Sequence, residues 1–310
     1  MPPTPEAALR LALLVNPRSR QGRGARAAAA IADRLAALGH SVLRVQPPSE
    51  ARVATDLAEA IESGVDRALI AGGDGLVNRA LPALLSSTAD VPGVPVGLVP
   101  VGTGNDFARS FGRVRGLDQM IEHALGATQL VDLLQTPGGP VASVATAGFS
   151  GRVNLTANAM TVPMGSMKYT AATLRESIRL RPVPLRMELD DGRVVDQDVS
   201  FVAIANTRYF GGGMAICPDA EPADGLLDIT VVDPLSAPRL LLFLPLVYSG
   251  RHVRHPAVTT FRARSVALRC GETFWGDGEP LGFSEGTIAV APRSLAIAVG
   301  GSVPGTGAGF

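Results

Sequence analysis

Residues 67–78 read Arg-Ala-Leu-Ile-Ala-Gly-Gly-Asp-Gly-Leu-Val-Asn. The apolar run Arg67–Ala71 predicts a buried strand, and it runs directly into the loop Gly72-Gly73-Asp74-Gly75. A helix is predicted over Leu76–Leu85, although Pro82 interrupts the pattern. Three glycines allow a close approach of the backbone to a ligand, and the amides at the start of a helix suit an anion. Taken alone, this loop is a weak signal, and a structural turn is the alternative explanation.

The sequence on both sides repeats the alternation of strand and helix. Further strands are predicted at Leu11–Val15, Ser41–Val45 and Val96–Pro100, and helices at Gly24–Leu38 and Arg52–Ser63. Strands that alternate with helices imply parallel βαβ units, with the helices on the faces of the sheet. Ligands of such sheets bind at the carboxyl ends of the strands, so the loops at these ends are the candidate sites.

A second polar glycine loop follows the strand predicted at Val96–Pro100. It reads Val101-Gly102-Thr103-Gly104-Asn105-Asp106-Phe107. Thr103 offers a hydroxyl, and Asn105 and Asp106 stand where a helix N-cap would lie. A plain capped helix explains either of these two residues singly. Two such loops after successive strands, however, predict a shared ligand site.

The pattern changes near Leu133, where short alternating strands begin. They are predicted at Leu185–Leu189, Val194-Val195, Phe201–Ala205, Leu227–Val232, Val266–Arg269, Thr287–Val290 and Ser294–Val299, with a hairpin turn at Asp190-Asp191-Gly192 and a helical excursion around Gly165–Leu180. This half is therefore expected to be an antiparallel β-sandwich. We predict one domain over residues 1–133, a second over 134–300, and a disordered glycine-rich tail over 301–310.

Charge and composition exclude several classes of protein. The 28 basic residues balance the 28 acidic ones, which argues against a nucleic-acid binder. Lys168 is the single lysine and lies far from any glycine loop, so a Walker A site is excluded. Cys217 and Cys270 are expected to be buried thiols, because they lack a metal-binding spacing. No signal peptide is visible at the N-terminus, and Leu240–Val247 is too short to span a bilayer, so it predicts a core helix, with a lipid-contacting surface as the alternative.

Several motifs together resemble the catalytic domain of the diacylglycerol kinase family. They are Asn16-Pro17 with Ser19, Gly72-Gly73-Asp74-Gly75 with Asn78, Gly102-Thr103-Gly104-Asn105-Asp106-Phe107-Ala108-Arg109, Gly211-Gly212-Gly213-Met214, Cys217-Pro218-Asp219-Ala220, Asp224-Gly225-Leu226-Leu227-Asp228 and Asp277-Gly278-Glu279-Pro280. The family includes diacylglycerol, sphingosine and ceramide kinases and soluble bacterial lipid kinases. The order and spacing of the motifs are similar to the bacterial members over residues 9–300.

The resemblance implies an α/β N-terminal domain with a Rossmann-like parallel sheet, of the type found in NAD kinases and diacylglycerol kinases, and a mainly antiparallel β-sandwich C-terminal domain. It implies that ATP binds between the two and that the second domain presents the lipid. The implied nucleotide-binding residues are Asn16, Gly72, Gly73, Asp74, Gly75, Leu76, Val77, Asn78, Thr103, Asn105 and Asp106. The implied Mg²⁺ ligands are Asp224 and the carbonyls of Glu221 and Leu226, and the implied catalytic residues are Glu279, as acid/base, and Asp74.

Two positions depart from the family pattern. Leu76 stands where the family usually has threonine, and Arg79 where it usually has glutamate; Arg20, where glycine is common, is a further loose match. Leu76 removes a hydroxyl that could contact phosphate. Arg79 reverses a charge, which either compensates by meeting a phosphate or signals altered activity.

Three functions remain open from the sequence. The leading one is an ATP-dependent kinase of a diacylglycerol-like or sphingoid lipid; the others are an NAD kinase and a catalytically weak nucleotide- or lipid-binding protein. The four acids Asp74, Asp106, Asp224 and Glu279 argue against the third. We expect a cytoplasmic protein that contacts its lipid peripherally at a membrane, and a homodimer is left open. The segment Arg251–His255 is interpreted as a solvated basic turn, with contact to anionic headgroups as the alternative.

Overall fold

The computed structural model describes residues 8–15, 23–85, 93–102, 104–149, 151, 153, 156 and 181–300. The chain forms two compact units. Unit 1 lies within residues 1–102, 111–131 and 294–310, and unit 2 within residues 103–110 and 132–293. The expected helix around Gly165–Leu180 and the expected tail over 301–310 lie outside the described residues.

Unit 1 is built on a parallel sheet, as the alternation of strands and helices predicts. Its strands are β1 (Arg10–Val15), β2 (Ser41–Val45), β3 (Arg67–Gly72) and β4 (Val96–Pro100), in the order β2-β1-β3-β4. The end of β18 (Glu285–Ala298) adds a further parallel partner beside β4, with Ile297 opposite Val96. This order is that of a doubly wound fold, in which the connections leave β1 and β3 toward opposite faces.

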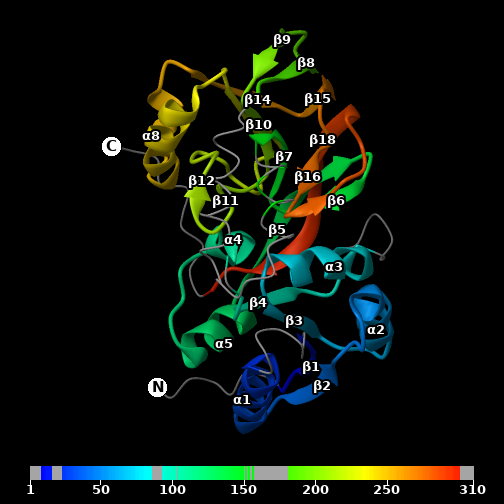
Figure 1. The fold of residues 1–310 in the computed structure, drawn as a ribbon. Coiled ribbons are helices and arrows are strands. Elements are labelled where there is room, and N and C mark those ends of the chain that lie inside the picture. Colours follow the sequence, from blue (N-terminus) through cyan, green and yellow to red (C-terminus); the bar gives the residue numbers. More distant parts are fainter. Residues whose placement is uncertain are drawn as a thin grey trace, which may run out of the picture. The chain divides into compact units, whose positions relative to one another are not determined.

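Helices cover both faces of this sheet (Figure 1). They are α1 (Arg23–Ala37), η1 (Glu50–Arg52), α2 (Val53–Glu62), α3 (Asp74–Leu84) and α5 (Leu117–Leu125). Alternate residues of β1 pack against Ile31 and Leu35 of α1 and Ile121 of α5, whereas α2 and α3 pack against each other and against β1 and β3. The helix expected over Arg52–Ser63 is preceded by a short 3₁₀ turn, and α5 was not predicted.

Unit 2 contains two facing antiparallel sheets. One has the order β14-β13-β10-β7-β16-β17; the other runs from the first part of β18 through β15 and β8 to β9, with β5 and β6 beside β18. The bounds are β5 (Thr128–Thr136), β6 (Gly139–Val141), β7 (Val144–Gly148), β8 (Val183–Leu189), β9 (Val194–Val199), β10 (Phe201–Ala205), β13 (Leu227–Val232), β14 (Val258–Ala263), β15 (Ser265–Cys270), β16 (Trp275–Gly276) and β17 (Glu279–Pro280). Side chains such as Met187 and Leu268 from one sheet and Ile204 and Ile229 from the other share one core, which confirms the β-sandwich.

Shorter elements complete unit 2. The pair β11 (Tyr209–Phe210) and β12 (Met214–Ala215) forms a small hairpin. The helices are α4 (Asp106–Arg109), α8 (Ala237–Tyr248) and the 3₁₀ turn η2 (Arg251–Arg254). The predicted hairpin turn at residues 190–192 is confirmed between β8 and β9, with Gly192 in the left-handed region. In the described part of the chain, no helix is long and apolar enough to cross a membrane.

One strand prediction is wrong. Thr287–Val290 and Ser294–Val299 were expected to be separate strands, but both lie in the single strand β18. The Pro-Arg pair between them bends the strand without ending it, since Arg293 is left-handed at φ 53° and its N–H is held by the Asp132 carboxylate at 2.7 Å. As a result, β18 pairs antiparallel with β15 in unit 2 and, beyond the bend, parallel with β4 in unit 1.

Candidate functional site

The first glycine loop lies at the topological switch point of unit 1. β1 and β3 are hydrogen-bonded neighbours in the sheet, and β3 ends at Gly72, directly before the loop. The crevice beyond the carboxyl ends of two such strands is where open α/β sheets bind their ligands. The position of the loop in the sheet therefore supports the expected ligand site independently of its residue types.

The loop passes straight into α3, with Asp74 as the first helical residue and Gly73 as the N-cap. The amides of Leu76 and Val77 donate to the Gly73 carbonyl at 3.0 and 3.3 Å, which closes the first turn. The amides at positions 74 and 75 belong to the set that an α-helix leaves without an intrahelical acceptor. They carry the positive end of the helix dipole and suit a phosphate oxygen.

The side chains of Leu76 and Val77 do not face a ligand. Each is only 6% exposed and belongs to the buried core of unit 1. A Cβ atom built at Gly72 would lie 2.6 Å from Leu76 Cδ2, so the leucine side chain covers the place where any larger residue at 72 would stand. The side chains of these two expected nucleotide-binding residues are therefore not available to a nucleotide, whereas Asn78 is partly exposed.

Arg79 is held within unit 1. Its Nη1 donates to the Gly75 carbonyl at 3.0 Å, and its Nη2 lies 2.9 Å from Glu50 Oε2. The guanidinium thus braces the carbonyl side of the glycine loop against the segment before α2. Arg79, which stands where the family usually has glutamate, therefore has a structural role in this loop.

Of the residues expected in the second loop, Asn105 and Asp106 can be placed. Asn16 of the first motif and Thr103 lie outside the described residues. Asn105 is the N-cap of α4 in a left-handed conformation, with φ 55°. Asp106 is buried, and its Oδ2 accepts the Gly212 N–H at 2.6 Å. The carboxylate therefore joins this loop to the Gly211–Gly213 loop between β11 and β12.

Arg109 is a further member of this cluster that sequence reasoning did not assign a role. Its Nη2 donates to the Gly104 carbonyl at 3.0 Å, its Nε lies 3.7 Å from Asp106 Oδ1, and its guanidinium lies 5.8 Å from the Tyr209 ring centroid. A Cβ at Gly213 would meet this guanidinium at 3.5 Å. The cluster of residues 104–109 and 209–213 is thus one connected piece, whose members are about a hundred residues apart in sequence.

Glu279 lies in a tight hairpin between β16 and β17. Asp277 and Gly278 both have positive φ, 49° and 89°, as a type I′ turn requires. The Asp277 carboxylate accepts the N–H groups of Ala142, Ser143 and Val144 at 2.8–3.3 Å. Glu279 itself is exposed. The aspartate of the motif therefore fixes the turn, and the glutamate is presented to solvent from a rigid base.

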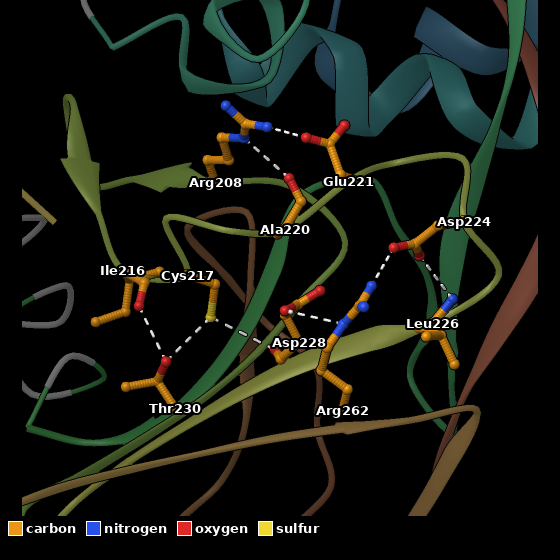
Figure 2. A network of polar contacts seen from close by, with 10 residues as sticks. All are labelled: Arg208, Ile216, Cys217, Ala220, Glu221, Asp224, Leu226, Asp228, Thr230 and Arg262. Atoms are coloured by element: carbon orange, nitrogen blue, oxygen red, sulfur yellow. Dashed lines mark hydrogen bonds and ion pairs between the residues drawn. The ribbon is translucent and has the colours of Figure 1, made fainter. Parts of the chain in front are cut away.

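The predicted metal loop is held by side-chain ion pairs (Figure 2). Arg262 Nη2 pairs with Asp224 Oδ2, and Arg208 pairs with Glu221. The Leu226 N–H donates to Asp224 Oδ1 at 3.0 Å. Arg262 also stands opposite Asp228 in the antiparallel pair of β13 and β14, with its Nε 3.5 Å from Asp228 Oδ1.

These residues do not fit a resident divalent cation. The one carboxylate of the expected ligand set, Asp224, is occupied by the Arg262 guanidinium and the Leu226 N–H. The Glu221 carbonyl accepts the N–H groups of Ala223 and Asp224. A positive charge already stands where the cation was expected, so the metal role of Glu221, Asp224 and Leu226 is not supported by this geometry.

Burial changes the titration of two groups beside this loop. It raises the pKa of Asp228 to about 6, against the opposing effect of Arg262. It raises the pKa of the Cys217 thiol to about 12, and the Cys217 sulfur lies 3.2 Å from Thr230 Oγ1. Cys217 and Cys270 are both free and buried, which confirms the expectation of two buried thiols.

Comparison with known proteins agrees with the motifs. Residues 10–136 match the diacylglycerol kinase catalytic domain, and residues 143–299 match the YegS C-terminal NAD kinase beta sandwich-like domain. The chain is 35% identical over 295 residues to a diacylglycerol kinase of Mycobacterium tuberculosis H37Rv, covering 92% of this chain and 93% of the relative. It is 32% identical over 252 residues to a probable YegS-like lipid kinase of Xanthomonas oryzae, covering 77% and 80%.

A solved structure shares the fold. The structure of a putative diacylglycerol kinase from Bacillus anthracis superposes with a TM-score of 0.78 at 21% identity, covering 94% of this chain and 98% of the other. The parallel sheet with its glycine loop at the switch point, the antiparallel sandwich and these matches agree with one another. The chain therefore belongs to the diacylglycerol kinase family and is a lipid kinase of that family.

Proposed function

We propose that this lipid kinase transfers the γ-phosphoryl group of ATP to a hydroxyl of a diacylglycerol-like or sphingoid lipid. The observation that carries the proposal is the match along nearly the whole chain to a relative named diacylglycerol kinase. The same chain retains Asp74 in the glycine loop and Glu279 in the rigid hairpin. Both carboxylates are assigned a role in phosphoryl transfer to an alcohol in the steps below.

The nucleotide phosphates are proposed to bind at the glycine loop. Backbone amides at the start of α3 are the donors there, and the chain has no P-loop lysine to add to them. Mg²⁺ is proposed to enter with ATP, where it neutralises part of the phosphate charge. Asp74 is the acidic residue of this loop, and we assign it to the nucleotide side of the reaction.

Glu279 is proposed to be the acid/base. The hydroxyl oxygen of the lipid forms a bond to the γ-phosphorus, the bond from that phosphorus to the bridging β–γ oxygen breaks, and ADP leaves. The hydroxyl proton passes to the Glu279 carboxylate. Exposure of Glu279 makes it accessible to a substrate, and the three N–H groups that hold Asp277 keep the hairpin from moving away.

A substrate panel tests this proposal. The protein is incubated with labelled ATP, Mg²⁺ and, separately, diacylglycerol, monoacylglycerol, sphingosine, ceramide and NAD. Label in at least one lipid, and its loss in Asp74→Asn but not in Asp56→Asn, supports the proposal. Asp56 of α2 is a matched control, because it is an aspartate of unit 1 that pairs with Arg52 outside the loop. Label on NAD alone would favour an NAD kinase, and label on no acceptor would favour a binding protein.

A further inference from the structure

Helix α8 of unit 2 exposes an unusually apolar surface. Leu240, Phe243 and Val247 are buried against the core. On the other side, Leu242 is 77% exposed, Tyr248 56% and Leu241 39%. A helix that is apolar around its whole circumference is expected to be buried on every side or to contact lipid. Figure 1 shows α8 at the outer edge of its unit.

The exposed residues form one continuous face. At 100° per residue, Leu241, Pro245 and Tyr248 lie within about 60° of one another, and Leu242 is their neighbour on the same side. The buried residues Leu240, Phe243 and Val247 fall on the opposite side of this helix. The face therefore follows from the sequence of α8 and does not arise from scattered single exposures.

Basic residues lie on α8 and on the turn that packs against it. Arg239 on α8 and Arg251 and Arg254 on η2, which packs against α8, are all exposed. Among the described residues, none of the three takes part in an ion pair, in contrast to Arg208 and Arg262 of the same unit. Residues 234–258 contain these three arginines and no aspartate or glutamate. The surface thus combines apolar side chains with uncompensated positive charge.

We propose that the α8 face, defined as Arg239, Leu241, Leu242, Tyr248, Arg251 and Arg254, docks on an anionic lipid bilayer. The leucines and the tyrosine enter the boundary between headgroups and acyl chains, and the arginines contact lipid phosphates. A bilayer fits better than a second copy of this chain, because two such faces would oppose arginine to arginine. The purpose of docking rests on the proposed function, since the lipid substrate resides in a membrane, but docking itself needs no nucleotide.

Vesicle cosedimentation tests the proposal in the absence of ATP. The full chain is mixed with vesicles of phosphatidylcholine alone or of phosphatidylcholine with phosphatidylglycerol. We expect binding to the anionic vesicles, weakened by added salt. Leu242→Ser is expected to lower the partition coefficient about tenfold, and Arg251→Glu or Arg254→Glu at least about fivefold each. Leu43→Ser is the matched control, because Leu43 is an exposed leucine of β2 in unit 1.

The outcomes separate docking from catalysis. Equal binding of wild-type protein and all α8 variants, or no binding of wild-type protein, overturns the docking proposal. A concentration-dependent dimer that Leu242→Ser abolishes, without any effect on vesicles, overturns it in favour of a second copy. If the wild-type protein binds vesicles but phosphorylates no lipid, only the proposed function is contradicted. If it phosphorylates lipid in detergent but does not bind vesicles, only docking is contradicted. Thermal unfolding of each variant verifies that it is folded.

Discussion

The contact between Gly72 and Leu76 makes a quantitative prediction about the first glycine loop. A methyl group at position 72 would lie 2.6 Å from Leu76 Cδ2 and 2.9 Å from Leu76 Cβ, whereas carbon atoms prefer about 3.5–4.0 Å. Gly72 has no positive φ, so alanine there costs no backbone strain. The effect of Gly72→Ala is then mainly the overlap with Leu76, which is expected to cost about 1–3 kcal/mol.

Shortening Leu76 to alanine removes its Cδ2 and Cγ atoms, the nearest and third nearest to a methyl at position 72, and keeps only the Cβ atom. Leu76 is almost fully buried, so Leu76→Ala alone is expected to cost about 2–5 kcal/mol through the cavity it leaves. In the double variant the methyl of residue 72 enters part of that cavity. The double variant should therefore lose less stability than the sum of the single variants, by about 1 kcal/mol or more.

Urea unfolding followed by circular dichroism measures the four free energies of this cycle. A cycle of Gly72→Ala with Leu35→Ala is the control, because Leu35 lies on α1, on the opposite face of the sheet, and the two changes should add. If Gly72→Ala and Leu76→Ala also add to within about 0.3 kcal/mol, Leu76 does not cover Gly72 and the packing argument fails. Leu76→Thr, which restores the usual family residue, is expected to be destabilising, because it buries a hydroxyl in this apolar site.

Three further predictions concern unit 2. Arg262→Met should remove the guanidinium that pairs with Asp224. Millimolar Mg²⁺ should then raise the melting temperature of the variant but not that of the nucleotide-free wild type. Equal stabilisation of both proteins by Mg²⁺ would indicate a resident metal in this loop. Asp277→Ala should lower the free energy of unfolding by about 2 kcal/mol or more, because buried N–H groups lose a charged acceptor, whereas Asp277→Asn should lower it less; chemical denaturation compares them. Burial lowers the pKa of His252 below 6.5. The free energy of unfolding should therefore fall as pH drops below 6.5, because the unfolded chain binds the proton more readily. Urea titrations at several pH values should show a weaker decline of this free energy at acid pH for His252→Gln than for the wild type.

Much of the fold could be predicted from the sequence, because local periodicity determines it. The alternation of apolar strands with amphipathic helices indicated the parallel sheet, and the turn Asp190-Asp191-Gly192 indicated one hairpin of the sandwich. The continuity of β18 could not be predicted, since its bend at Arg293 depends on Asp132, which is 161 residues away. Helix α5 spans only Leu117–Leu125, and its short apolar pattern was missed.

The candidate site was predicted less completely, because its residues act through partners distant in sequence. The link from Asp106 to Gly212 and the bracing of the loop by Arg109 leave no local signal. The motif could not distinguish backbone from side-chain roles either, and only burial shows that the Leu76 side chain is packed in the core of unit 1. The ion pair of Asp224 with Arg262 likewise joins residues that are far apart in the sequence, so no local pattern could show it.

We propose that this chain phosphorylates a lipid hydroxyl with Glu279 as the acid/base. The most direct measurement is the kcat/KM for phosphatidate formation from ATP and diacylglycerol in mixed micelles, for the wild type, Glu279→Gln and Glu285→Gln. Glu285 is a suitable control, since it is an exposed glutamate of β18 that pairs with Arg269. We expect Glu279→Gln to lower kcat/KM by about 10²–10⁴-fold and Glu285→Gln to leave it within about twofold of the wild type. Equal kcat/KM values for the wild type and Glu279→Gln would rule out Glu279 as the acid/base.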